Sequence, residues 1–138
     1  MKKMLLIHFM FLSFFCFCQN DIEVYSADIL YMVAWGSENN EIISKKPIGR
    51  NVEVKFNRVF KSIVITFFTE DNEPNILRFS YIQDVKKTDA WRMNIQGANN
   101  CMVYNYLPEY GKLIMMYEKL YENGTVVGLL VENAIKKN

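Results

Sequence analysis

From Asn51 onward, the sequence is a succession of apolar segments separated by turn residues. The segment VEVKF (52–56) alternates apolar and charged side chains, as a strand with one buried face does. The segment 60–69 is β-branched and aromatic on both faces, which favours a central strand. Five further segments have a similar composition: 76–83, 90–96, 101–107, 112–121 and 125–133. Strands that follow one another about every 10 to 15 residues predict an all-β fold.

The connections between these segments are short, and this favours an antiparallel up-and-down meander of seven or eight strands. We expect a small lipocalin-like barrel, with a two-sheet β-sandwich as the alternative, because a meander has the same sequence pattern in both. The succession of strands resembles that of small lipocalin-like secreted proteins. The G-x-W motif of those proteins is absent, since AWGS places Trp35 before Gly36. The resemblance therefore implies an architecture and no ligand.

The stretch before Asn51 has a weaker pattern. Ile22 and Val24 favour a first strand over 22–35, whereas a short helix capped by Ser26 is the alternative. We favour the strand. Residues 36–51 are rich in polar residues and are predicted to form a loop, with at most a short strand at 41–44.

The first eighteen residues, called the leader below, have the layout of a secretory signal. Two lysines precede an apolar run over 4–18, and the chain becomes polar at Gln19. The run is shorter than the roughly 20 residues of a membrane-spanning helix, so a retained anchor is less favoured. We therefore expect residues 1–18 to be removed and residues 19–138 to form a single β domain. The protein would be exported to the periplasm, cell surface or extracellular space, with no stable membrane span.

Two cysteines end the leader. Cys16 and Cys18 occupy the positions where a signal peptidase needs small side chains, if the cut falls between Cys18 and Gln19. Lipidation is less favoured because Phe15 and Phe17 stand where a lipoprotein signal has a small residue. A C-x-C metal or redox site is least favoured, because no further ligands lie nearby in the sequence.

Loss of the leader also removes the one histidine, His8, and leaves Cys101 as the one cysteine. Catalytic triads need an imidazole, and zinc sites draw on Cys and His. The sequence contains no calcium-binding loop of the EF-hand type either. We therefore expect a protein with no catalytic residues, no metal and no cofactor. Cys101 is expected to be a small buried core residue.

The charge balance argues against a nucleic-acid partner. Sixteen Lys and Arg residues, less the two in the leader, leave 14 against 15 Asp and Glu, so the net charge after processing is −1. A DNA or RNA site needs a basic field. The lysine pairs at 45–46, 86–87 and 136–137 are isolated, which is typical of solvated turns and termini.

Aromatic side chains are the candidates for ligand binding. Tyr104 and Tyr106 share one face of a predicted strand, and Trp91 and Tyr117 lie on neighbouring strands. If these four residues surround a barrel mouth, they would bind an apolar small molecule or a lipid. If they instead pack the interior, the protein is a solid-core structural or interaction domain whose partner is another protein of the bacterial cell envelope.

Two carboxylates interrupt otherwise apolar strands. Glu118 and Glu132 would be acids with a raised pKa if they pointed into an apolar pocket. The more common arrangement is an outward-facing carboxylate between inward-facing neighbours, and Lys119 beside Glu118 favours it. We expect both residues to lie on the outer surface.

Overall fold

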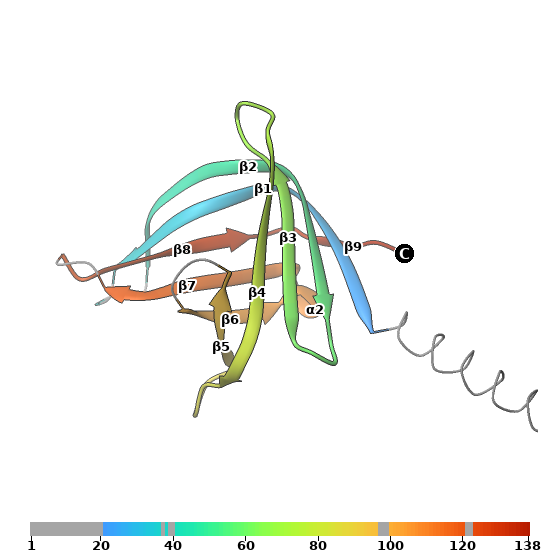
Figure 1. Cartoon of the computed structure of the whole chain (residues 1–138). Helices are drawn as coiled ribbons and strands as arrows, with labels where there is room; N and C mark the ends of the chain where they lie inside the picture. The colour runs from blue at the N-terminus through green and yellow to red at the C-terminus, as the bar shows by residue number, and fades with distance from the viewer. Residues whose placement is uncertain (1–20, 37, 39–40, 97–99, 121–122) are drawn as a thin grey trace, which may run out of the picture.

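The structure, a computed structural model, describes residues 21–36, 38, 41–96, 100–120 and 123–138 (Figure 1). The proposed cut between Cys18 and Gln19, the alternatives at Cys16 and the histidine at position 8 lie outside these residues, and they stay predictions.

The described residues form nine strands and one short helix. Their bounds are β1 (Ile22–Gly36), β2 (Ile42–Asn57), β3 (Ser62–Phe68), β4 (Pro74–Asp84), β5 (Ala90–Ile95), β6 (Asn100–Tyr106), α2 (Leu107–Tyr110), β7 (Lys112–Leu120), β8 (Thr125–Val131) and β9 (Ile135–Lys136).

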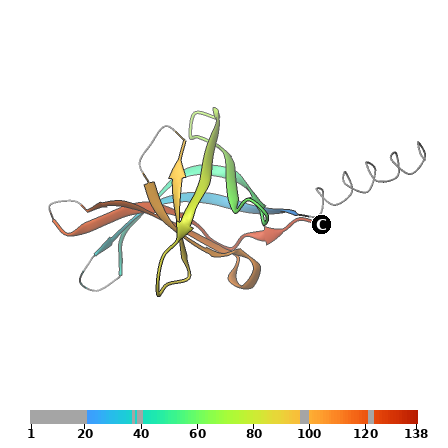
Figure 2. The ribbon, with the colours of Figure 1, turned by 60° about the horizontal axis from the view of Figure 1, so that its bottom comes forward.

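Consecutive strands from β1 to β8 pair antiparallel with one another, and β1 also pairs with β8. This last pairing closes the sheet, so the described strands form an eight-stranded up-and-down barrel. Figure 2 shows the barrel in a second orientation. β9 adds two residues beside β1, where Ser26 is opposite Ile135. The predicted barrel is confirmed and the sandwich alternative is wrong.

The N-terminal part of the barrel is more regular than the sequence suggested. Residues 22–35 are strand, as favoured, and the helical alternative is wrong. The short strand allowed at 41–44 is confirmed as the start of β2, which begins at Ile42. The loop predicted for the rest of the range is wrong after residue 44, because β2 continues and pairs with β1 along its whole length. Pro47 is accommodated beside a register shift between Leu30 and Tyr31, which is where a strand tolerates proline. The polar residues of this segment are compatible with a strand because they are exposed.

One connection is helical. The connection between β6 and β7 is α2, a single helical turn that ends at Gly111, whose φ of 59° lies in the left-handed region. Leu107 of α2 is buried against the barrel core, and the Gly111 carbonyl accepts a hydrogen bond from the Ala134 N–H at 2.9 Å. Among the described residues, no helix is long and apolar enough to cross a membrane.

Inward-pointing side chains pack together in the barrel interior. Every strand from β1 to β8 contributes to one buried cluster, called the core cluster below. Its members are Tyr25, Ala27, Leu30, Val52, Val54, Phe56, Ile63, Ile65, Phe67, Phe79, Met93, Ile95, Cys101, Val103, Leu107, Leu113, Met115, Leu129 and Val131. Alternate residues of each strand therefore point inward and pack on one another, as in other small barrels.

Candidate functional site: an apolar outer face of the barrel

The four predicted ligand-binding residues do not share one face. Trp91 and Tyr117 are half-buried and pack against the core cluster, and the Trp91 ring stacks on Phe56 with 5.5 Å between ring centroids. Tyr104 and Tyr106 alternate with inward-pointing Val103, so they lie on the outer side of β6. Their rings stack on each other, with centroids 6.2 Å apart. The structure therefore separates one aromatic pair inside the barrel from another outside it.

The remaining cysteine lies in the core, as predicted. Cys101 is buried in the core cluster. Desolvation by burial, together with the nearby charge of Glu118, raises the pKa of its thiol to about 12. A thiol of this kind is neutral at pH 7 and is a poor nucleophile or metal ligand.

Cys101 is therefore expected to be inert towards a thiol reagent in the folded protein. Its rate of reaction with Ellman's reagent at pH 8 should be about 100-fold or more below the rate in denaturant, because reaction requires the barrel to open. A stopped-flow comparison of the two conditions measures this. Similar rates would show that the thiol is accessible in the native state.

The two candidate carboxylates are outward, as predicted. Arg92 binds both oxygens of Glu118, with its Nε 2.6 Å from Oε1 and a terminal guanidinium nitrogen 3.0 Å from Oε2. This pairing lowers the pKa of Glu118. Glu132 accepts a hydrogen bond from Lys45, whose ammonium also lies 4.1 Å from the centroid of the Tyr31 ring. Neither carboxylate is in the setting of a general acid.

A third carboxylate, Glu23, is buried at the end of the barrel where β1 begins. It is 5% exposed and accepts hydrogen bonds from Arg58, from Lys136 at 2.8 Å and from the Tyr25 hydroxyl at 3.2 Å. The bond from Arg58 outweighs the cost of burial, so the pKa of Glu23 is lowered to about 2. The same site raises the pKa of Tyr25 to about 12, mainly through desolvation. Glu23 is thus ionised at neutral pH, and it joins the start of β1 to the β2–β3 turn and to β9.

Metal binding finds no support in the part of the chain that the structure describes. No group of three or more Cys, His, Asp or Glu side chains there has the arrangement of a metal site.

The outer surface of the barrel carries an unusual run of apolar residues across adjacent strands. The strand register places two rows of side chains side by side on β1, β8, β7 and β6. The first row is Tyr31, Leu130, Ile114 and Tyr104. The second row is Val33, Gly128, Met116 and Met102. Outward positions of a barrel in water are commonly polar, so these rows call for an explanation.

We call this surface the outer apolar face, and it comprises Tyr31, Val33, Trp35, Met102, Tyr104, Ile114, Met116 and Leu130. Val33, Trp35 and Leu130 form a buried cluster of their own, separate from the core cluster. Tyr31, Ile114 and Met116 pack around that cluster and stay partly exposed.

Charged pairs border the outer apolar face on two sides. In the register, Lys45 of β2 is opposite Val33, and Arg92 of β5 is opposite Met102. These two cations pair with Glu132 and Glu118. The face therefore has an apolar centre and a charged border.

The opposite side of the barrel lacks this character. There the outward rows on β2, β3 and β4 are mixed. They are Lys55, Val64 and Arg78, and then Glu53, Thr66 and Ile76. Contiguous apolar rows across several strands are thus found on the side where the β1–β2 and β7–β8 hairpins extend together (Figures 1 and 2). Exposed apolar side chains on the opposite side, such as Ile76 and Phe68, stand among polar residues.

The outer apolar face is adjoined by a surface hollow of about 520 Å³. Tyr106, Ile114 and Glu132 contribute to its lining. A second hollow, of about 580 Å³, is also lined by Glu132. It lies beside β1, next to the segment that connects β8 to β9. Both hollows lie on the outer surface of the barrel.

Sequence reasoning missed the outer apolar face, although its signal was present. Segments 101–107 and 112–121 carry apolar residues at both odd and even positions, so either face of these strands is able to pack. Comparison of the chain with protein-family models, with curated proteins and with solved structures finds no match. The interpretation of this face therefore depends on the chain's own geometry.

Proposed function

We propose that this barrel is a non-catalytic interaction module of an exported protein, and that its outer apolar face binds another protein of the cell envelope. The observation that carries the proposal is the partly exposed part of the outer apolar face, which surrounds a buried apolar centre and is bordered by the pairs Lys45–Glu132 and Arg92–Glu118. The partly exposed residues are Tyr31, Met102, Tyr104, Ile114 and Met116. Protein interfaces have this composition, with Tyr, Trp and Met at the centre and charge at the border.

The rival hypothesis, an apolar small molecule or lipid held in the barrel, has less support. A ligand of that kind needs an interior cavity of about 300 Å³ or more. The inward side chains of all eight barrel strands belong to one buried cluster. Trp91 packs against this cluster and stacks on Phe56, so the aromatic side chains that face inward are used in packing.

Site-specific photo-crosslinking in the exporting cell tests the proposed interface. A benzophenone amino acid at Tyr104 is expected to give one discrete adduct, whereas the same group at Val64, a half-buried outward position on the opposite side, gives none. Adding Ile114→Lys should lower the Tyr104 adduct by about tenfold or more, because a lysine at the interface centre is costly to desolvate. The matched change Val64→Lys should leave it unchanged.

Thermal unfolding of both lysine variants checks that they remain folded. Equal adducts from Tyr104 and Val64 would contradict a specific interface. Native mass spectrometry examines the rival hypothesis on the same protein. A reproducible small-molecule adduct that is lost on unfolding, without a crosslink from Tyr104, would favour the ligand-binding barrel.

A further inference from the structure

The turn between β2 and β3 exposes two adjacent apolar side chains at its tip. Val59 is 64% exposed and Phe60 is 71% exposed, and we call this pair the apolar tip. The Asn57 side-chain oxygen accepts hydrogen bonds from the N–H groups of both residues, each at 3.0 Å. Turn tips are usually polar, so a hydrogen-bonded turn that presents Val-Phe to the outside is not explained by folding.

The apolar tip lies at the end of the barrel where the chain enters β1, called the entry end below. The Arg58 N–H donates to the Asp21 carbonyl at 2.9 Å, which joins the turn to the first described residue. Ile22 is opposite Asn57 in the register and is 48% exposed, so a third apolar side chain is beside the turn. The chain before Asp21 contains the apolar run 4–18.

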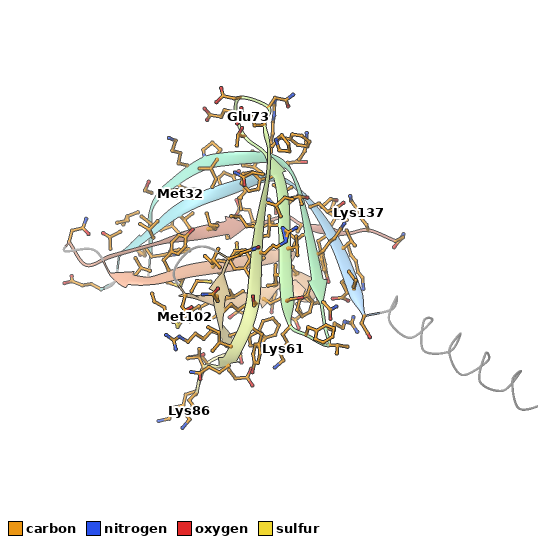
Figure 3. All side chains as sticks on the ribbon, in the orientation of Figure 1. Met32, Lys61, Glu73, Lys86, Met102 and Lys137 are labelled. Carbon is orange, nitrogen blue, oxygen red and sulfur yellow. The ribbon has the colours of Figure 1, made fainter. Side chains whose placement is uncertain are left out.

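The charges of the barrel are unequally divided between its two ends. At the entry end, the turns 57–61 and 85–89 contain four basic residues and one acidic residue, and the flanking Asp21, Glu23 and Asp84 add three acidic residues. At the far end, the loop 69–73 between β3 and β4 contains three acidic residues and no basic one. Figure 3 shows Lys61 and Lys86 at the entry end and Glu73 at the other. Ion pairs with Glu23 and Asp84 reduce the effective charge of Arg58 and Lys61, whereas Lys86 and Lys87 are exposed on the second turn.

We propose that the entry end docks on an anionic membrane surface, with the apolar tip inserted among the lipid headgroups. An exposed Phe and Val with lysines nearby match a bilayer interface, where the apolar groups reach the acyl boundary and the cations stay at the phosphates. The acidic far end then points away from the negative surface, which favours one orientation of the barrel. Docking of this kind is peripheral and needs no membrane-spanning segment.

Vesicle co-sedimentation of the exported protein tests the proposal. Wild type is expected to bind phosphatidylcholine vesicles that contain 30% phosphatidylglycerol, and to bind pure phosphatidylcholine at least about fivefold less, because Lys86 and Lys87 are exposed at the entry end. Phe60→Ser should lower the partition coefficient by about tenfold. The matched control Phe68→Ser changes an exposed phenylalanine on the outer side of β3, and it should lower binding by less than about twofold.

A tryptophan at the tip reports insertion of the tip itself. This holds also for a purified chain that retains the run 4–18 and binds vesicles through it. In Phe60→Trp, anionic vesicles should shift the added fluorescence to shorter wavelength, whereas Phe68→Trp should show no shift. Unchanged partition of Phe60→Ser, together with an unshifted Phe60→Trp spectrum, would overturn the proposal. The proposal would also be overturned if position 60 crosslinked to a protein while Phe60→Ser left vesicle binding unchanged. Because Phe60 is mostly exposed, these variants are expected to fold.

Discussion

Replacing Gly128 by alanine should destabilise the barrel by about 3 kcal/mol. Gly128 lies in β8 opposite Met116 of β7. A Cβ atom at this position would overlap the carbonyl oxygen of Met115 and would come within 2.9 Å of the Trp35 ring. Backbone oxygen cannot move aside as a flexible side chain does, so the β7–β8 ladder would have to separate locally. Equilibrium unfolding in urea measures the loss as a lower midpoint.

Gly36→Ala is the matched control for this change. Gly36 ends β1 and is opposite Thr125 at the other end of β8. Among the residues that the structure describes, a Cβ atom there would meet the side chain of Ile43, at an ordinary 3.8 Å. Its free energy of unfolding should stay within about 1 kcal/mol of wild type. Equal losses in the two variants would show that the approach of β7 to β8 at Gly128 is not the cause.

Replacing Glu23 by glutamine should lower the free energy of unfolding by about 2 to 3 kcal/mol at pH 7. Loss of one partner in a buried ion pair costs about 3 to 5 kcal/mol, and the lower figure applies because Arg58 and Lys136 are more than half exposed and keep contact with water. The change weakens the joint between the start of β1, the β2–β3 turn and β9. Glu118→Gln is the control, because Glu118 is a carboxylate paired with Arg92 on the outer surface. It should lower the free energy of unfolding by less than about 1 kcal/mol.

The pH dependence gives a second test of Glu23. Its pKa is about 2 in the folded protein and is 4.5 ordinarily, so the unfolded chain binds the proton more readily. The stability that Glu23 contributes is therefore complete above about pH 5 and is lost as the pH falls towards 2. Wild type should lose more stability over this interval than Glu23→Gln does. Parallel pH profiles for the two proteins would contradict this role of the carboxylate.

Much of the fold is predictable because alternation is a local property of the chain. Residues 52–56 alternate cleanly, and the structure places Val52, Val54 and Phe56 in the core cluster. The segment 45–50 was predicted as a loop because its lysines and proline disfavour a strand locally. β1 overrides that preference by pairing with it residue by residue. The partner is the preceding strand of the same hairpin, and its residues lie outside a short window around 45–50.

The sequence by itself determined that this chain is an antiparallel β protein, that Tyr104 and Tyr106 share a face, and that Cys101 has the character of a core residue. Only the tertiary structure decided which face is inside. In β6 both faces are apolar, so side-chain periodicity cannot choose between them. Closure of the barrel chooses, because the interior has room for Cys101 and Val103 among the core side chains, while the two tyrosines stay outside. The outer apolar face exists because register across four strands aligns residues that are distant in sequence.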